Sequence, residues 1–516
     1  DKVAGLTATA ANLSAVLAWT ANSETNIAKY AVYKSTTSGF TPASSDKVGD
    51  TESGSIVTYT VTGLTNLTPY YFKVKAINTN NQAGEYSSQV TATPEYQGPD
   101  WYVALAASGG SASNEGSSNS PMLNLTDAVT AASTGHTIHI AAGTYTFTSA
   151  SEGNITFDGS KTLVIKGAGA ATTIIDANLK HRHFYFSASS NGTLLDTTFK
   201  IMDLTLKNGR PQSTDHGGSV YMTGYDVSNY GYKGHSPLFQ NVVFQSNQAK
   251  FSTSDYGKQG GAVYATRSNP YFRNVEFKYN TAPREGGAVY VHRADSNKTV
   301  TFERTTFTSN YTDPGESETN QYGGAVYLND VGKVVFNNSV FDSNTVNLNC
   351  NCDHYGGAVY ANELYDSLVV RNTKFRYNKV YKPSGNEGGG ARAGAMYVRT
   401  QGHFLVTNSI FIGNEAVSST YTNDNGSTSD RSAYGGALYI DLNNFSNAGG
   451  YTYPYKSIFI NNTFVDNKSE GSGSQQGHGG AIRYEWEEKT VLINNIFWGN
   501  TVNNTTDTTG RFEINN

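Results

Sequence analysis

The chain has 516 residues and a formal net charge of −5, and only 15% of its residues are charged. This charge gives no argument for a nucleic-acid partner, and the sequence holds no run of about eighteen apolar residues that could span a membrane. The length and the abundance of glycine, tyrosine and phenylalanine (53, 35 and 24 residues) predict a secreted all-β protein with two or more domains.

Residues 1–95 predict a β-sandwich, because short alternating strands at 17–19, 30–33, 59–64 and 70–76 are separated by turn-rich segments. The unit resembles a fibronectin type III domain in its core pattern, which is carried by Trp19, Leu64, Tyr70, Phe72, Val74, Ala76, Asn78 and Gly84. The resemblance implies that Tyr70 forms the tyrosine corner of that family and that the unit serves as a spacer or docking module. No Arg-Gly-Asp integrin-binding motif occurs in the sequence.

Residues 96–100 are expected to form a linker, and residues 101–516 a right-handed parallel β-helix. The opening at 100–145 resembles the start of secreted pectate-lyase-like proteins, with matching segments at 102–103, 110–116, 120–121 and 128–145. We expect a short helix at 123–132 to cap the first coil, because the open end of a stacked repeat needs a cover.

Two phrases recur from about residue 217 onward: Gly-Gly-Ala-Val-Tyr, as at 260–264, and Asn-x-x-Phe-x-x-Asn, as at 274–280. Copies of the first phrase lie at 217–221, 286–290, 323–327, 356–360, 393–397, 435–439 and 479–483. Apolar residues such as Val263 and Ala265 alternate with polar or aromatic ones, which is the period of a strand with one buried face. Each repeat therefore predicts one coil of a parallel β-helix. The turn before Gly-Gly varies in length, which predicts that these turns carry binding functions.

The repeated region, residues 217–500, resembles the polymorphic outer-membrane protein repeat, which is defined by Gly-Gly-Ala-Ile and Phe-x-x-Asn tetrapeptides. The resemblance implies a β-helical protein displayed outside the cell of a Gram-negative bacterium, often as an adhesin. The sequence begins without a signal peptide, as expected of a mature or trimmed chain. It ends inside a coil, so we expect either a cut chain or a second chain that covers this end, for example in end-to-end assembly.

The last asparagine of each Phe-x-x-Asn phrase is expected to join a structural ladder of hydrogen bonds along the coils. The ladder comprises Asn247, Asn280, Asn310, Asn344, Asn378, Asn414, Asn467 and Asn500.

The tyrosine of each Gly-Gly phrase is expected to point away from the core, because its neighbours in the strand point inward. These residues, called the Tyr column below, are candidates for binding a glycan or a surface protein. They are Tyr264, Tyr290, Tyr327, Tyr360, Tyr397 and Tyr439, with Tyr221 one coil earlier. The structural alternative is that the rings stack on one another beneath the variable turns and only stabilise the coils.

Polar residues follow each of these tyrosines, and stacking brings them together. They are Arg267, His292, Arg293, Asn329, Asp330, Asn362, Glu363, Arg399, Asp441 and Glu485. A polysaccharide lyase needs a base and a cation, which Arg267, His292 and Arg293 could supply. A glycoside hydrolase needs two carboxylates, for which Asp330 and Glu363 are the candidates. The simpler interpretation is a row of ion pairs along an exposed face.

The sequence predicts no metal site and no cofactor with regular ligand spacing. Asp- and Asn-rich turns at 313–320 and 423–430 offer oxygen ligands that calcium binds, but without a regular pattern. Cys350 and Cys352 are too few soft ligands for zinc, and a local disulfide or two free thiols is the expected state.

Taken as a sequence, the chain predicts a non-catalytic secreted or surface protein with a structural or adhesive role. It would assemble end to end or bind an extracellular glycan or surface protein. The alternative is an enzyme, either a lyase or a hydrolase, that acts on an extracellular polysaccharide.

Overall fold

The computed structural model describes the chain except for residues 213–214, 228–230, 251–257, 314–319, 348–353, 383–389, 401, 423–427, 442–455, 473–476, 486–488, 504 and 507–516. By its internal packing, the chain divides into two units, Asp1–Ala132 and Ser133–Asn516. The first unit holds both the sandwich and the segment that follows it, so the predicted domain boundary after residue 95 falls inside this unit.

The first unit begins with two antiparallel sheets, with strand orders β1-β2-β5 and β4-β3-β6-β7. The strands are β1 (Ala4–Ala11), β2 (Ser14–Thr20), β3 (Ile27–Ser35), β4 (Lys47–Asp50), β5 (Thr58–Thr62), β6 (Tyr70–Asn78) and β7 (Val90–Ala92). Trp19, Tyr30 and Phe72 pack in the core between the sheets. The backbone N–H of Thr65 donates to the Tyr70 hydroxyl at 3.1 Å, which is the tyrosine corner that was predicted.

The same unit ends with strand β8 (Asp100–Val103) and the helix α1 (Leu125–Ala131), which pack against each other. Helix α1 lies within the segment 123–132, where a short helix was predicted. Its buried face is formed by Ala128 and Val129.

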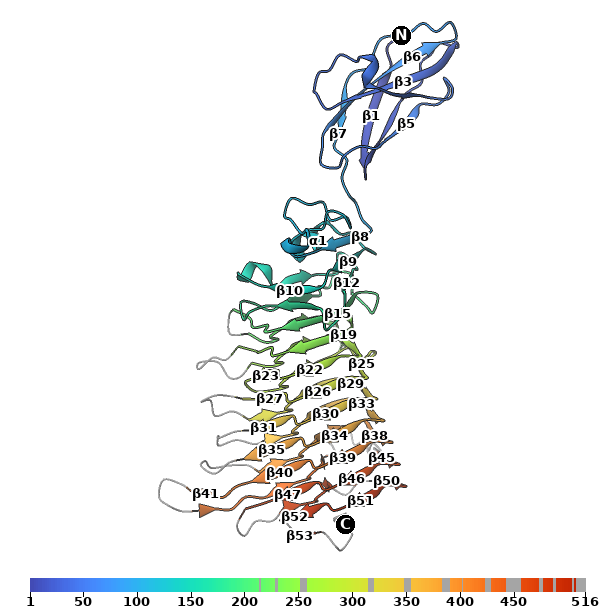
Figure 1. Cartoon of the computed structure of the whole chain (residues 1–516). Coiled ribbons are helices and arrows are strands. Elements are labelled where there is room, and N and C mark those ends of the chain that lie inside the picture. Colours follow the sequence, from blue (N-terminus) through green and yellow to red (C-terminus); the bar gives the residue numbers. More distant parts are fainter. Residues whose placement is uncertain are drawn as a thin grey trace. The chain divides into compact units, whose positions relative to one another are not determined.

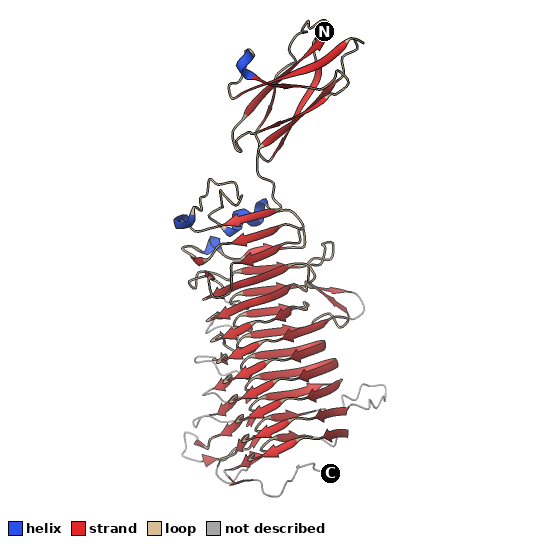
Figure 2. Ribbon diagram, turned by 45° about the vertical axis from the view of Figure 1, so that its right-hand side comes forward, coloured by secondary structure: helices blue, strands red, loops and turns tan. Residues whose placement is uncertain are grey.

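The second unit is a right-handed parallel β-helix, as the repeats predicted. Its strands pair in register with those of the next coil and form five strips, numbered here in the order in which the chain crosses them (Figures 1 and 2). The first strip holds the Gly-Gly-Ala-Val-Tyr phrase and the third strip holds the Phe-x-x-Asn phrase.

The bounds of the strands follow by strip. The first strip contains β11 (Ile155–Phe157), β14 (Phe184–Ser187), β16 (Val220–Thr223), β20 (Val263–Thr266), β24 (Val289–His292), the first half of β29 (Val326–Asn337) and of β33 (Val359–Arg371), β37 (Met396–Thr400), β44 (Leu438–Ile440) and β49 (Ile482–Tyr484). The second strip contains β9 (Thr137–Ile140), β12 (Val164–Gly167), the first half of β15 (Lys200–Lys207) and of β19 (Leu238–Gln245), β21 (Tyr271–Arg273), β25 (Thr299–Glu303), the second halves of β29 and β33, β38 (His403–Thr407), β45 (Lys456–Ile460) and β50 (Lys489–Ile493).

The third strip contains β10 (Gly143–Thr146), β13 (Thr173–Asp176), the second halves of β15 and β19, β22 (Glu276–Lys278), β26 (Thr306–Thr308), β30 (Val340–Asp342), β34 (Lys374–Arg376), β39 (Ile410–Ile412), β46 (Thr463–Val465) and β51 (Ile496–Trp498). The fourth strip contains β23 (Thr281–Ala282), β27 (Tyr311–Thr312), β31 (Thr345–Asn347), β35 (Lys379–Lys382), β40 (Glu415–Ser418), β47 (Lys468–Glu470) and β52 (Thr501–Val502), and ends on β53 (Thr505–Thr506). The fifth contains β28 (Gln321–Tyr322), β32 (His354–Tyr355), β36 (Ala391–Arg392), β43 (Ala433–Tyr434) and β48 (Gly477–His478). Two antiparallel hairpins leave the coils: β17 (Tyr225–Val227) with β18 (Gly231–Lys233), and β41 (Tyr421–Thr422) with β42 (Thr428–Ser429).

Stacking of like on like sets the register of the coils. Val263 pairs with Val289, which pairs with Val326 in the next coil. The buried rings of the third strip lie face to face, with centroids 4.6 Å apart at Phe307 and Phe341. This separation is close to the distance of about 4.7–4.9 Å between hydrogen-bonded strands, so the ring stack and the sheet reinforce each other.

Each coil turns its corners through left-handed residues. The first asparagine of the Asn-x-x-Phe phrase has a positive φ, as at Asn274 (53°) and Asn338 (52°), and so has the first glycine of Gly-Gly, as at Gly286 (63°). The second glycine is required for a different reason: a Cβ at Gly261 would lie 2.0 Å from the carbonyl oxygen of Gly287 on the next coil. The backbones of adjacent coils therefore touch at this position, and no side chain fits between them.

Candidate functional site

The predicted structural asparagines lie in one hydrogen-bonded column inside the corner between the third and fourth strips. The Asn310 side-chain N–H₂ donates to Oδ1 of Asn344 at 3.0 Å, and the Asn344 side chain donates in turn to Asn378 at 2.9 Å. Each Oδ1 also accepts the backbone N–H of the preceding asparagine, as from Asn310 to Asn344 at 3.0 Å. The column runs without a break through Asn247, Asn280, Asn310, Asn344, Asn378, Asn414, Asn467 and Asn500.

A second buried polar column, which sequence reasoning missed, lies at the residue after the first asparagine of the phrase. The backbone N–H of Thr305 donates to Ser339 Oγ at 3.2 Å, and the backbone N–H of Ser409 donates to Asn462 Oδ1 at 2.9 Å. The missed signal was a small polar residue at the same phrase position in successive coils. Both polar columns are structural, because their polar atoms bond to one another and to the backbone.

The Tyr column is a continuous stack of rings on the outer side of the first strip. Ring centroids lie 4.9 Å apart between Tyr264 and Tyr290, 4.8 Å between Tyr290 and Tyr327, and 4.9 Å between Tyr360 and Tyr397, with interplanar angles of 4°, 4° and 11°. The ring faces are thus occupied by neighbouring rings. Ligand binding by these tyrosines remains a prediction, and a ligand could contact only the edges of their rings.

A second row of side chains lies over this stack, at the residue before each Gly-Gly pair. Tyr322 contacts Tyr360 with ring centroids 4.7 Å apart, and the Arg392 guanidinium lies 5.9 Å from the centroid of Tyr439. Tyr439 is 4% exposed and Tyr290 is 5% exposed. The tyrosines predicted to face outward are therefore largely covered, as in the structural alternative of rings stacked beneath the turns, and the covering side chains come from neighbouring coils.

Burial governs the ionisation of the Tyr column. Removal from water raises the pKa of Tyr290, Tyr327 and Tyr397 well above the usual value of a phenol. At the far end of the column, Tyr439 donates a hydrogen bond to the Glu485 carboxylate. The column is therefore neutral at physiological pH and unsuited to act as a base.

The candidate polar residues lie in two adjacent columns beyond the tyrosines. The first column ends the strands of the first strip, and its members pair in register from coil to coil: Thr266, His292, Asn329, Asn362 and Arg399, followed by Asp441 and Glu485. Arg267, Arg293, Asp330 and Glu363 follow at left-handed corner positions in the other.

Both candidate catalytic arginines are ion-paired. Arg267 Nε lies 2.5 Å from Oδ1 of Asp226, a residue of the β17–β18 hairpin that sequence reasoning did not consider. Arg293 Nε lies 3.5 Å from Asp330 Oδ2, and that carboxylate also accepts a hydrogen bond of 3.2 Å from the Tyr232 hydroxyl.

His292 directly precedes Arg293, its backbone carbonyl accepts the N–H of Arg267 at 2.8 Å, and its side chain is half-buried. Burial and the neighbouring Arg293 lower the pKa of His292 to about 4. Its imidazole is therefore neutral at pH 7 and can accept a proton. The arrangement brings together the three residues of the predicted lyase site, with Asp226 beside Arg267 and Asp330 beside Arg293.

Metal and cysteine predictions fall partly outside the described residues. Among the residues that the structure describes, no group of three or more histidine, cysteine, aspartate or glutamate side chains could hold a metal ion. Most of the Asp- and Asn-rich turns at 313–320 and 423–430, and both Cys350 and Cys352, lie outside the described residues. In the described part of the chain, no helix is long and apolar enough to cross a membrane.

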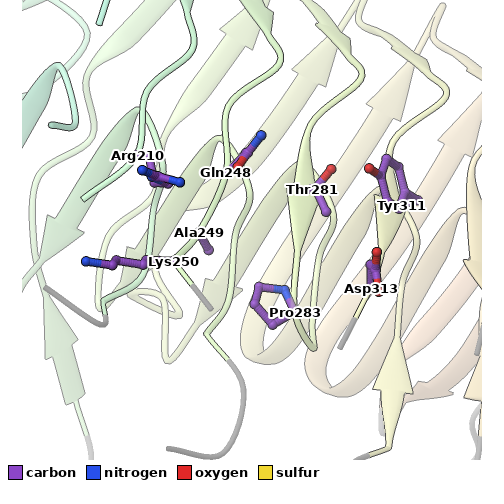
Figure 3. A pocket seen from close by; sticks show the side chains of 8 residues that line it. All are labelled: Arg210, Gln248, Ala249, Lys250, Thr281, Pro283, Tyr311 and Asp313. Carbon is purple, nitrogen blue, oxygen red and sulfur yellow. The ribbon is translucent and has the colours of Figure 1, made fainter. Parts of the chain in front are cut away.

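A cleft of about 380 Å³ lies at the fourth strip and was not anticipated from the sequence (Figure 3). The residues that line it lie just after the asparagine ladder on successive coils. The first residue after each ladder position is Arg210, Gln248, Thr281 or Tyr311. The third residue after the ladder position is Lys250, Pro283 or Asp313 on the last three of these coils. Gln248 pairs with Thr281, and Thr281 pairs with Tyr311, so these side chains form a row. Alternation along the strand was the signal that could have identified them.

Comparisons with known proteins support the two-part description. Residues 1–93 match the fibronectin type III domain, and residues 241–266 match the Chlamydia polymorphic membrane protein repeat. No curated protein matches the chain.

Three solved structures are similar to parts or most of the chain. A family 28 exopolygalacturonase of Yersinia enterocolitica is 11% identical over 96% of this chain and 99% of its own, with a TM-score of 0.20. A pectate lyase of Pectobacterium carotovorum is 11% identical over 96% of this chain and 100% of its own, with a TM-score of 0.16. A fibronectin type III-like protein of Clostridium thermocellum is 26% identical over 18% of this chain and 90% of its own, with a TM-score of 0.15. These similarities are too low to carry an argument about activity. The chain joins a fibronectin type III domain to a parallel β-helix in which residues 241–266 match the Chlamydia polymorphic membrane protein repeat.

Proposed function

We propose that this protein is a secreted or surface-displayed rod with a non-catalytic, structural and adhesive role on a Gram-negative bacterium. The combination of a parallel β-helix with a polymorphic membrane protein repeat is typical of proteins displayed outside the cell. The fibronectin type III domain serves as a spacer or docking module in this proposal.

The observation that carries the proposal is the pairing of the candidate catalytic cations. A lyase holds the substrate carboxylate with a cation, and here Arg267 is hydrogen-bonded to Asp226 while Arg293 lies at ion-pair distance from Asp330, so each guanidinium already has a carboxylate of the same chain beside it. The other repeated side chains serve the coils themselves, as the asparagine ladder and the Tyr column do.

A polysaccharide lyase is the second candidate, and one observation favours it. His292 is neutral at pH 7 because burial lowers its pKa to about 4, and Arg267 and Arg293 belong to the adjacent column. A substrate that displaced Asp226 or Asp330 would find a base and two cations together.

The test incubates the full chain with calcium ions and a panel of uronate-containing and neutral polysaccharides. Ultraviolet absorbance follows unsaturated products, and a colour reaction follows reducing ends. We expect neither to appear. Products that form with the wild-type chain and disappear in His292→Gln would establish the enzyme instead.

Assembly of the rod through its ends is a separate prediction. Light scattering over a range of protein concentrations measures it, because end-to-end growth raises the scattered intensity per unit mass with concentration. A constant mass equal to one chain would contradict assembly but would leave display and adhesion standing.

A further inference from the structure

We propose that the cleft at the fourth strip binds an acidic saccharide, with its anionic group at Arg210 and Lys250 and its hydroxyl or amino groups toward Asp313. This inference deepens the adhesive part of the proposed function and rests on it. It places binding at a face that neither the Tyr column nor the candidate catalytic residues occupy.

The first argument is the free cation at one end of the cleft. Within the described residues, the Arg210 guanidinium has neither an ion-pair nor a hydrogen-bond partner. Other cations at the same coil position are neutralised: Lys379 Nζ lies 2.7 Å from Glu415 Oε2 on the next coil. On the coil after Arg210, the corresponding position holds Gln248, which is an amide and carries no charge.

Lys250 adds a second positive charge. Its ammonium donates to the backbone carbonyl of Gln212. An ammonium has three donors, so two remain for a ligand. Figure 3 places Lys250 and Arg210 at one end of the row, with Tyr311 and Asp313 at the other. Carboxylate and sulfate groups both suit a guanidinium and an ammonium held side by side.

The rest of the lining favours a saccharide over an acidic peptide. Between the two ends lie an amide at Gln248 and a hydroxyl at Thr281, which can each exchange hydrogen bonds with sugar hydroxyls. Tyr311 is 41% exposed, and an aromatic ring packs well against the apolar face of a sugar. Asp313, at the end of the cleft away from the cations, can accept hydrogen bonds from the hydroxyl or amino groups of a sugar.

The size of the site also fits. Its volume of about 380 Å³ is within the range of about 300–1,000 Å³ seen for small-ligand pockets. Four coils contribute to it, and at about 4.8 Å per coil the row spans roughly 14 Å, the length of a short oligosaccharide rather than of one small ion.

The test measures binding by isothermal titration calorimetry with the full chain. The probes are polygalacturonate for carboxylate, dextran sulfate for sulfate ester, uncharged dextran, and polyglutamate for an acidic peptide. We expect at least one acidic polysaccharide to bind, with affinity that falls as salt rises, and dextran and polyglutamate to bind more weakly. The acidic polysaccharide that binds more tightly shows whether the site prefers a carboxylate or a sulfate ester.

Two variants change the proposed site, and a control variant removes two positive charges from another part of the coils. Arg210→Gln with Lys250→Gln removes both cations and should weaken binding by about tenfold or more. Gln248→Glu keeps the cations but supplies Arg210 with the carboxylate that Glu415 gives to Lys379, and should weaken binding to a similar degree. The control, Arg371→Gln with Lys374→Gln, removes two exposed charges from the second and third strips and should leave binding unchanged.

Three results overturn the inference: no acidic polysaccharide binds, polyglutamate binds as tightly as the polysaccharide, or the site variants bind as the control does. If the double variant fails to fold, as judged by circular dichroism, the isosteric Gln248→Glu decides alone. Release of unsaturated or reducing ends during titration would contradict the non-catalytic function, while the variants would still decide the place of binding.

Discussion

One ladder asparagine closes four side-chain hydrogen bonds in the interior of the coil. Asn344 accepts from the backbone and the side chain of Asn310, and donates to the carbonyl of Phe307 and to Asn378, at 2.9–3.0 Å. Asn344→Ala leaves buried donors and an acceptor without partners, each at about 1–3 kcal/mol, so we expect a loss of about 3 kcal/mol or more. Chemical denaturation followed by circular dichroism measures it. Thr308→Ala, on the outer side of a neighbouring coil, is the control, and an equal effect of both changes would refute the role of the ladder.

The two glycines of each Gly-Gly pair should differ in their tolerance of a methyl group. A Cβ at Gly324 would lie 2.2 Å from the Gly357 carbonyl oxygen, so the coils would have to separate. At the first position the chain itself carries Ala393 with a φ of 62°. A Cβ at Gly323 would also lie 2.2 Å from a carbonyl oxygen, that of Val326, but this contact is within one turn and Ala393 occupies the equivalent position on another coil. We therefore expect Gly323→Ala to cost about 1–2 kcal/mol for its left-handed backbone and Gly324→Ala, which would force two coils apart, to cost more than about 3 kcal/mol. Thermal melts of the two variants provide the measurement, and the reverse order would contradict the close approach of the backbones.

At the scale of the element, the Tyr column acts as a packed stack. Tyr327 is 8% exposed and contacts the rings of Tyr290 and Tyr360 at 4.8 and 5.2 Å. Tyr327→Ala removes both contacts and should cost about 3–5 kcal/mol, as other buried aromatic truncations do. Tyr327→Phe keeps the rings and should cost less than about 1 kcal/mol. Denaturation of both variants tests this, and equal losses would mean that the hydroxyl, not the ring, carries the effect.

The same column predicts loss of stability at alkaline pH. Burial raises the pKa of Tyr290, Tyr327 and Tyr360 in the folded chain, whereas a phenol in the unfolded chain titrates near about 10. The stabilisation is complete below the unfolded pKa and is lost as pH rises above it, because the unfolded chain releases its phenolic protons first. We expect tyrosinate absorbance and unfolding to rise together, and Tyr327→Phe to shift both to higher pH. Full tyrosinate absorbance in a chain that is still folded would contradict the buried stack.

At the scale of the whole molecule, the sandwich and the coils have cores of their own. The sandwich core runs from Val3 to Ala92 and includes the fully buried Phe72. We expect calorimetry to resolve two transitions, with Phe72→Ala lowering one and Asn344→Ala lowering the other. A single transition that both variants lower equally would show that the two cores unfold together.

Much of the β-helix could be predicted from the sequence because its repeats are local. Val263, Asn280 and Phe277 recur at fixed positions in the phrases, and a strand period of two decides which of them point inward. Since each coil contacts only its neighbours, the spacing of the phrases was enough to predict the stack and its asparagine column. The fibronectin type III core was predictable for the same reason, from alternating strands such as the one that runs from Tyr70 through Ala76.

The sequence by itself thus determined which residues stack, whereas the tertiary structure decided what lies over them. The cover of Tyr439 by Arg392 and the pairing of Arg267 with Asp226 join side chains from different coils and turns of unequal length. The cleft residues do lie at repeated positions, but only the folded chain shows that Arg210 and Asp313, about one hundred residues apart, line one hollow. Repetition fixes the distance between like positions, but turns of variable length carry no period, so their contacts follow only from the folded chain.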